Sequence, residues 1–303
     1  MFKLRDWIDE SNLSDYLSCN PRAIKYLEEN PDMIDWFLLS RNPEAVSIIE
    51  KNPDKINWQR LSINPSAIHY LTKNIDIFID KIDWEMLCVN PNAIELLTEY
   101  PERIDWGMLS SNTSAIQLLE ENPERIDWNS LSYNTAAIHL IKQYPERINW
   151  KKLSTNPAAI SILETNQDKI DWMSLSTNTR ALKLLTENQD KIDWNSLSWN
   201  PGAIPLIEKN LDKVNWTLLS DNPSAIHILE QNLDKVNWTL LSENPAAIHI
   251  LEANQDNIEW IEFSTNPAIF EYDYPHMTRP FTEELMANRF HPKNLDKFED
   301  WGF

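Results

Sequence analysis

The chain has 303 residues, with 47 Asp and Glu against 27 Lys and Arg, so its net charge is −20. An acidic chain of this kind repels phosphate backbones and anionic lipid surfaces, which argues against nucleic-acid and membrane partners. The chain has 3 glycines, whereas phosphate loops, dinucleotide fingerprints and nucleophile elbows all need glycine at fixed positions. Composition therefore argues against enzymes built on those motifs.

One phrase of 22 residues repeats along most of the chain, and residues 42–63 state it well: Asn-Pro-Glu-Ala-Val-Ser-Ile-Ile-Glu-Lys-Asn-Pro-Asp-Lys-Ile-Asn-Trp-Gln-Arg-Leu-Ser-Ile. Its tryptophan recurs every 22 residues, except for one step of 26 between Trp58 and Trp84. The tryptophans of this series are Trp36, Trp58, Trp84, Trp106, Trp128, Trp150, Trp172, Trp194, Trp216, Trp238 and Trp260. A fixed period of this length indicates a stack of similar two-element units, each too small to fold alone.

The first half of the phrase predicts a short helix. Asn42 can accept a hydrogen bond from a free backbone N–H of the first turn, and Pro43 suits the first helical position. Apolar residues then follow at helical spacing, as at Val46 and Ile49. We expect a helix of about ten residues that ends near the second Asn-Pro.

The second half predicts another helix with two possible starting points. It begins either at Asn52 or at Asn57, in which case Ile56 packs on Leu61 as a hydrophobic staple. We favour the second start because Asp, Asn or Glu precedes every tryptophan of the series. The alternative architecture of this period, a leucine-rich repeat, would place proline where a strand needs a backbone N–H.

The predicted fold is therefore an all-α solenoid of about eleven 22-residue units, two short helices each, with N- and C-terminal caps. Residues 1–19 form the first cap, residues 20–265 the repeats, and residues 266–303 a degenerate repeat with a C-terminal helical cap or docking tail. We expect the tryptophans to be core, because a buried indole removes roughly 150–250 Å² from water. The asparagines that open the units are Asn20, Asn42, Asn64, Asn90, Asn112, Asn134, Asn156, Asn178, Asn200, Asn222 and Asn244.

Two units depart from the phrase. Four extra residues before Trp84 predict one more helical turn or a small apolar bulge. This insertion is either simply tolerated by the array or a docking site for a partner. Gly202 and Pro205 interrupt the first helix of the unit that Asn200 opens, beside Trp199. A tryptophan outside the regular series is either packed locally or exposed as an anchor for a partner.

Four residues are candidate partner-binding positions: Trp199, Tyr133, His227 and His249. At their positions the residue type differs from repeat to repeat, whereas the core positions of the repeat keep the same residue types. Histidines of neighbouring units lie about 10 Å apart, too far to share a zinc ion whose ligands lie about 2.1 Å from it. Cys19 and Cys88 are expected to be small buried residues in a reducing compartment. We expect no catalytic residue, no cofactor and no metal site.

The repeated phrase Asn-Pro-x-Ala-Ile-x-x-Leu-Glu-x-Asn-x-Asp-Lys-Ile-Asp-Trp-x-x-Leu-Ser resembles tandem-repeat proteins of giant (nucleocytoplasmic large) DNA viruses. The segment Glu-Glu-Leu-Met-Ala-Asn-Arg-Phe-His-Pro-Lys-Asn-Leu-Asp-Lys-Phe, residues 283–298, resembles the ending common among them. The resemblance covers nearly the whole chain. It implies a viral origin and a place in the cytoplasm of the infected host cell or in the virion, and it carries over no catalytic residue.

The expected function is a non-enzymatic scaffold or adaptor that binds a host or viral protein, with self-association as a further option. By loose analogy, helical repeat arrays in other large viruses act as adaptors for host proteins. The alternative function is structural, as a spacer or cement protein of the capsid.

Overall fold

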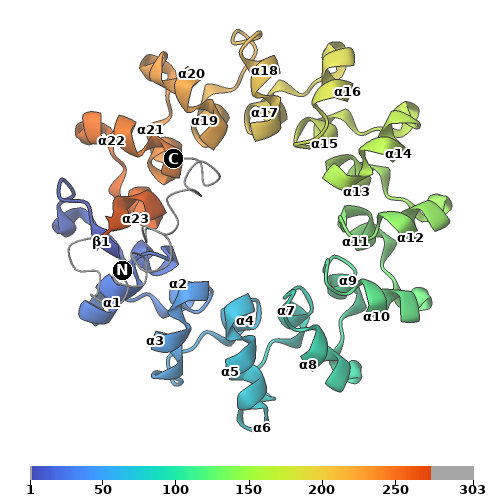
Figure 1. Ribbon diagram of the computed structural model, residues 1–303, viewed down its shortest axis with the longest axis horizontal. Helices are drawn as coiled ribbons and strands as arrows, with labels where there is room; N and C mark the ends of the chain where they lie inside the picture. Colours follow the sequence, from blue (N-terminus) through green and yellow to red (C-terminus); the bar gives the residue numbers. More distant parts are fainter. Residues whose placement is uncertain (1, 274–303) are drawn as a thin grey trace, which may run out of the picture.

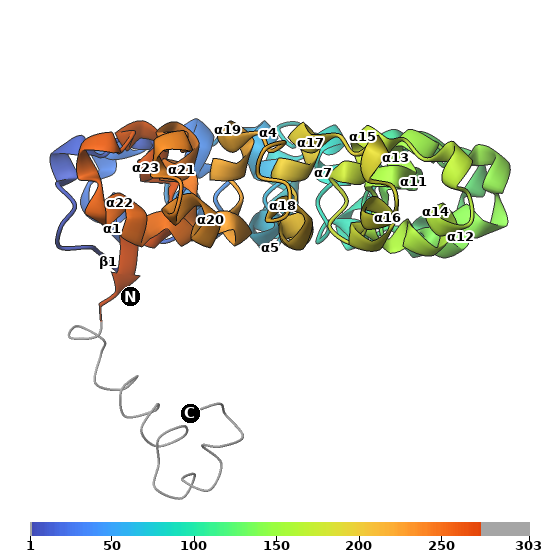
Figure 2. The same ribbon diagram turned by 90° about the horizontal axis from the view of Figure 1, so that it is seen from above.

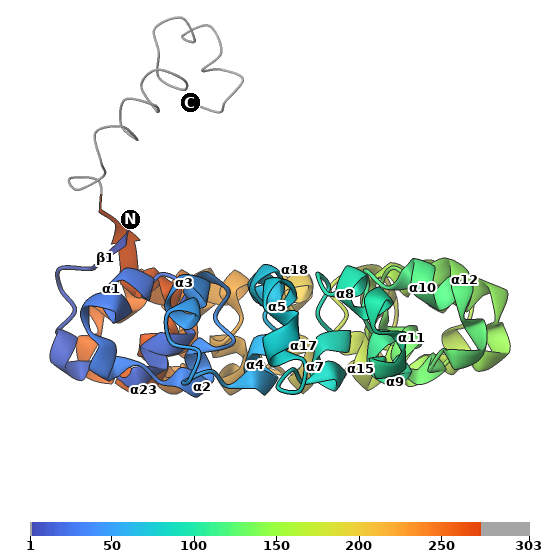
Figure 3. The ribbon, with the colours of Figure 1, turned by 90° about the horizontal axis from the view of Figure 1, so that it is seen from below.

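The computed structural model describes residues 2–273, and these residues confirm the all-α repeat solenoid. Each unit places one helix in an inner row and one in an outer row, and both rows run around a ring (Figure 1). In the edge views the ring is a flat band of two-helix units (Figures 2 and 3). The chain therefore does not form an open rod, because its last repeat lies beside its first.

The inner row holds the helices that begin at the tryptophans, preceded by the 3-10 helix η2. Its members are η2 (Asp15–Cys19), α2 (Trp36–Leu39), α4 (Trp58–Ser62), α7 (Trp84–Cys88), α9 (Trp106–Leu109), α11 (Trp128–Tyr133), α13 (Trp150–Thr155), α15 (Trp172–Ser176), α17 (Trp194–Ser198), α19 (Trp216–Ser220), α21 (Trp238–Glu243) and α23 (Trp260–Thr265).

The outer row holds the helices that follow the Asn-Pro or Asn-Thr pairs, often after a 3-10 turn such as Pro43–Ala45. Its members are α1 (Ile24–Glu29), α3 (Val46–Glu50), α5 (Ile68–Lys73), α8 (Ile94–Glu99), α10 (Ile116–Glu121), α12 (Ile138–Gln143), α14 (Ile160–Glu164), α16 (Leu182–Glu187), α18 (Ile204–Ile207), α20 (Ile226–Glu230) and α22 (Ile248–Ala253).

Helix capping follows the expectation in both rows. Asn42 Oδ1 accepts from the backbone N–H of Glu44 at 3.1 Å, and so opens the outer segment of its unit. Asn57 Oδ1 accepts from the N–H of Arg60 at 3.0 Å, which confirms the favoured start of the inner helix. In most units the other possible start, near the second Asn-Pro, is a single 3-10 turn, as at Pro123–Arg125.

One buried asparagine per unit ties that unit to the one before it. Asn156 accepts from the N–H of Ala158 at 2.9 Å, while its Nδ2 donates to the carbonyl of Ser132 at 3.1 Å and of Asn134 at 3.2 Å. Every later asparagine of the series, Asn266 included, also donates to the preceding inner helix. Asn20 donates to the carbonyls of Ser264 at 3.3 Å and Asn266 at 2.9 Å, so the series returns to its start.

A second series of hydrogen bonds runs through the buried serines of the inner row. Ser132 Oγ donates to the carbonyl of Trp128 at 2.7 Å and accepts from the N–H of Asn149, in the next unit, at 3.0 Å. Where the serine is replaced, Cys88 Sγ accepts from the N–H of Asp105 at 3.3 Å. Because these polar groups are satisfied inside the core, they specify how far each unit is displaced from its neighbour.

The two terminal segments, expected to cap opposite ends of the array, pair with each other instead. Strand β1 (Phe2–Leu4) lies antiparallel to β2 (Phe270–Tyr272), with Lys3 opposite Glu271. Arg5 Nε donates to the carbonyl of Ala268 at 2.8 Å. This closure removes both exposed ends of the solenoid within the described residues. The C-terminal helical cap or docking tail expected at the end of the chain lies outside the described residues.

The tryptophans pack against the core but do not form its driest part. Trp150 is half-buried, as are the other described members of the series except Trp84, which is 9% exposed. The leucine three residues later is fully buried, as at Leu153, and so is the outer-row alanine, as at Ala159. These leucines and alanines, together with the buried asparagines and serines, form the continuous core.

A cation from the following unit covers most of the half-buried indoles. Lys169 Nζ lies 4.7 Å from the ring centre of Trp150, a distance at which the ammonium is attracted to the ring face. The same arrangement pairs Lys55 with Trp36, Lys81 with Trp58, Arg103 with Trp84, Arg125 with Trp106, Lys191 with Trp172, Lys213 with Trp194 and Lys235 with Trp216. The Lys or Arg that stands three residues before most tryptophans of the series therefore has a packing role.

Both irregular units keep their place in the ring. The four extra residues form the additional turn α6 (Ile75–Phe78), and Phe78 packs 4.7 Å from the ring of Trp58. At Gly202 the backbones of two units approach so closely that a Cβ would lie 2.1 Å from the carbonyl oxygen of Thr179. Pro205 falls in the first turn of α18, where proline is tolerated, and the helix ends after four residues.

The asparagine series gives a stability prediction. Asn156→Ala removes three hydrogen bonds and takes the donor from the buried carbonyl of Ser132, so it should lower the free energy of unfolding by about 2–4 kcal/mol. Asn166→Ala is the matched control, because Nδ2 of Asn166 donates to the backbone only within its own unit, to the carbonyl of Ile162 at 2.9 Å. Its loss should be about 0.5–1.5 kcal/mol. Urea unfolding of both variants measures the difference, and equal losses would contradict the proposed linkage.

Candidate functional site

The inner row of helices exposes one side that the core does not use. In α4, Leu61 and Ser62 are fully buried, whereas Gln59, Arg60 and Ile63 are exposed or half-buried. These three positions, the first, second and fifth after each tryptophan, recur in every inner helix from α2 to α23. We call their exposed side chains the inner wall, because the helices that carry them form the inner row of the ring (Figure 1).

Large apolar side chains are concentrated on the inner row. Most of the strongly exposed large apolar residues of the described chain lie there, among them Met173 (62% exposed), Tyr133 (56%) and Ile261 (54%). Phe37 and, in η2, Tyr16 are further examples. Elsewhere Ile77 of the extra turn is exposed at 70%. Clustered exposed apolar groups mark surfaces that bind other molecules.

The charge of the inner wall differs from that of the whole chain. Its bases are Arg41, Arg60, Lys151 and Lys152, and its acids are Glu85, Asp221, Glu243 and Glu262. Four bases and four acids balance, while the chain as a whole carries −20. The excess acid of the chain therefore lies outside the inner wall, which as a whole carries no net charge.

The acids of the inner wall lie close enough together to affect one another. Desolvation raises the pKa of Glu243, and the nearby carboxylates of Asp221 and Glu262 raise it further. Asp221 Oδ2 accepts a hydrogen bond of 2.7 Å from Nε1 of Trp199. One arc of the wall, from α19 to α23, is thus acidic.

Two of the four candidate residues belong to the inner wall. Tyr133 lies five residues after the tryptophan that begins α11, and Trp199 lies five residues after the tryptophan that begins α17. Each is 56% exposed. The Trp199 ring is held by its bond to Asp221 while it remains open to solvent. An exposed but oriented tryptophan suits the role of an interface anchor.

The other two candidates lie elsewhere. His227 and His249 are on the outer helices α20 and α22, and each pairs with a glutamate of the preceding unit. Nε2 of His227 lies 2.8 Å from Oε1 of Glu208, and His249 pairs in the same way with Glu230. The structure therefore separates the histidines from the inner wall, and their partners show a role in linking outer helices.

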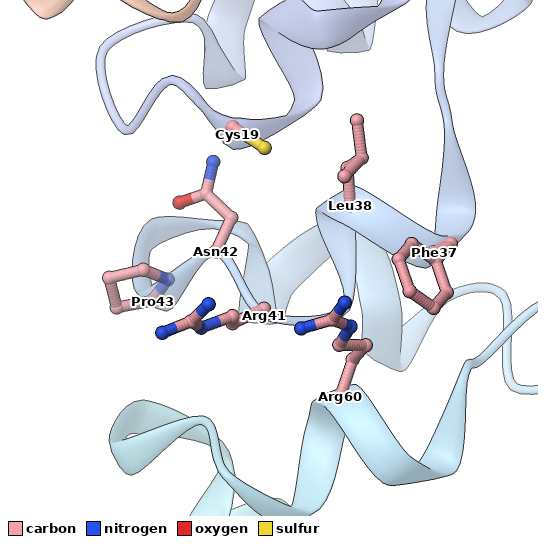
Figure 4. Close-up of a pocket in the computed structure, with 7 residues that line it drawn as sticks. All are labelled: Cys19, Phe37, Leu38, Arg41, Asn42, Pro43 and Arg60. Carbon is pink, nitrogen blue, oxygen red and sulfur yellow. The ribbon is translucent and has the colours of Figure 1, made fainter.

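A pocket on the inner wall was not identified from the sequence. It has a volume of about 360 Å³ and is lined by Cys19, Phe37, Leu38, Arg41, Asn42, Pro43 and Arg60 (Figure 4). Its residues come from three successive units, which explains why no single copy of the phrase indicates it. The available signal was the presence of two arginines at wall positions that are uncharged in most other units.

Between residues 2 and 273 no group of three or more His, Cys, Asp or Glu side chains is placed to hold a metal ion. None of the helices in that range is both long and apolar enough to span a bilayer. Comparison of the chain with protein-family models, with curated proteins and with solved structures found no match.

The two cysteines differ in environment. Cys88 is buried in α7 as expected, whereas the Cys19 side chain is exposed, contrary to expectation. Desolvation raises the pKa of Cys88 to about 11, and the N–H of Asp105 offsets part of that rise. Partial desolvation also raises the pKa of Cys19, while the charges of Arg41 and Arg60 lower it.

Thiol labelling tests this difference. At pH 8 a thiol of pKa about 11 is thiolate in about one molecule per thousand, and the thiolate is the reacting form. In the native protein N-ethylmaleimide should therefore label Cys19 at least about tenfold faster than Cys88, as measured by mass spectrometry. The labelling rate of Cys88 should rise about tenfold per pH unit. Cys19→Ser should abolish the fast phase, and rapid labelling of native Cys88 would show that this thiol is not buried.

Proposed function

We propose that the chain is a non-enzymatic adaptor that binds a protein partner on the inner wall of its ring. The observation that supports this most strongly is the concentration of exposed apolar side chains, Tyr133, Met173 and Trp199 among them, on one charge-balanced surface. Protein interfaces favour aromatic and methionine side chains at their centre and are depleted of charge there. The inner wall has the first property, and its four bases balance its four acids in a chain of net charge −20.

The partner is a protein in this proposal because the electrostatics disfavour the alternatives. Protein surfaces that bind nucleic acids use stripes of Lys and Arg, which displace counterions from the phosphate backbone. The inner wall carries only two isolated pairs of bases, Arg41 with Arg60 and Lys151 with Lys152, and no continuous stripe. A surface with exposed aromatic and methionine side chains and no net charge suits a polypeptide better than a polyanion.

The proposal includes the origin that the resemblance implies. The partner is then a host or viral protein, and the adaptor acts in the cytoplasm of the infected cell. The alternative, a spacer or cement protein of the capsid, receives less support from the fold. A solenoid grows into filaments through its free ends, and here β1 and β2 join those ends to each other. Self-association would have to use a face of the ring.

Variants of the inner wall test the proposal by proximity labelling in infected cells. Tyr133→Ala/Trp199→Ala removes two aromatic side chains that are each 56% exposed, so folding should be retained while labelling of the partner falls at least about tenfold. His227→Ala/His249→Ala is the matched control on the outer row and should label the same partner as the wild type. Equal loss in both variants, or recovery of the chain mainly in purified virions, would contradict the adaptor proposal.

A further inference from the structure

Two arginines share the inner-wall pocket without an acidic partner. Arg41 follows α2 and Arg60 lies in α4, so they come from adjacent units and approach the same cavity (Figure 4). Within residues 2–273 neither guanidinium forms an ion pair, although the chain carries −20. Both side chains line the same pocket as Cys19, and their charges lower the pKa of its thiol.

The acid that acts on Cys19 is already engaged. The carboxylate of Asp35 also acts on Cys19, but its Oδ1 accepts from the backbone N–H of Leu38 at 2.9 Å and so caps α2. Arg60 instead lies over an aromatic face, with its guanidinium carbon 4.2 Å from the ring centre of Phe37. This contact orients the guanidinium plane and leaves its N–H donors free for a ligand.

Apolar groups complete the pocket. Phe37 is 43% exposed, and Leu38 and Pro43 line the cavity beside it. A ligand that fits both features carries an anionic group next to an apolar one. Guanidinium groups bind carboxylates through paired hydrogen bonds that are stronger than those between neutral groups.

We propose that this pocket binds an acidic side chain, Asp or Glu flanked by an apolar residue, in the partner protein. The proposal rests on the proposed function and specifies the chemistry of the contact. A carboxylate is favoured over a phosphate because repulsion by the surrounding acidic protein grows with the charge of the ligand. The carboxylate sits between Arg41 and Arg60, and the neighbouring apolar residue packs on Phe37 and Leu38.

Selection from a displayed library of random twelve-residue peptides tests the proposal without knowledge of the partner. The full chain is the bait, and consensus peptides are then synthesised and titrated by calorimetry. Wild-type protein should enrich peptides with Asp or Glu beside Leu, Ile, Phe or Met. Replacing the acid of the consensus by its amide should weaken binding at least about tenfold, since a charged hydrogen-bonded pair is lost.

The variant pair Arg41→Gln/Arg60→Gln should lose at least about tenfold in affinity for the consensus peptide. Lys151→Gln/Lys152→Gln is the matched control, because it removes two bases from another part of the inner wall and changes the net charge equally. It should weaken binding less than about threefold. Arg41→Lys/Arg60→Lys keeps the charge and should lose most of the affinity, because lysine cannot form the paired bonds. Circular dichroism confirms folding of each variant.

Several results would overturn the inference. Enriched peptides that lack acids, or equal losses in the arginine and lysine pairs, would remove the pocket from the interface while leaving the adaptor proposal intact. Inorganic phosphate or an oligonucleotide that displaces the consensus peptide at a lower concentration than a carboxylate peptide would show a phosphate site instead. A library that yields no binder would overturn the acidic anchor and the proposed function together.

Discussion

The buried asparagine of each unit is the interaction on which the ring depends. Its oxygen caps the outer segment of its own unit, and its Nδ2 donates to the unit before, as at Asn156. Since an amide without these partners would be costly in a fully buried position, every unit must lie at nearly the same displacement and rotation from its neighbour. Repetition of one rotation produces a curved array, and here the curvature brings Asn20 back to Asn266.

Closure determines which surfaces remain for binding. Both ends of the array are used by the pairing of β1 with β2 and by the packing of Trp7, whose ring lies 5.8 Å from that of Phe263. The junction is the least well satisfied part of the described core, since Nε1 of Trp7 and Oγ of Ser14 are buried without a hydrogen-bond partner. With the ends paired, the inner wall remains as a surface that exposes large apolar side chains, and the Arg41–Arg60 pocket lies within it.

Sequence reasoning succeeded where a feature is decided within one unit. The caps at Asn42 and Asn57 and the extra turn α6 follow from local residue types, and the structure has all three. Closure could not be predicted, because it is the sum of many small rotations that no single phrase encodes. The tryptophans were expected to form the core, yet the stacked Lys and Arg side chains allow them to stay half-buried, as Lys169 does for Trp150. The pocket was missed because three units contribute to it.

Cross-linking of the two terminal strands tests the closed ring most directly. Lys3 and Glu271 are Cα partners in the β1–β2 pair, so Lys3→Cys/Glu271→Cys in a Cys19→Ser/Cys88→Ser background should form an intramolecular disulfide under mild oxidation. Glu146 lies in the turn Pro145–Arg147 between α12 and α13, which are across the ring from β1 (Figure 1), so the pair Lys3→Cys/Glu146→Cys should remain reduced. Nearly complete cross-linking of the monomer for the first pair is the predicted result. Free thiols, or disulfides only between molecules, would show an open array and contradict the account.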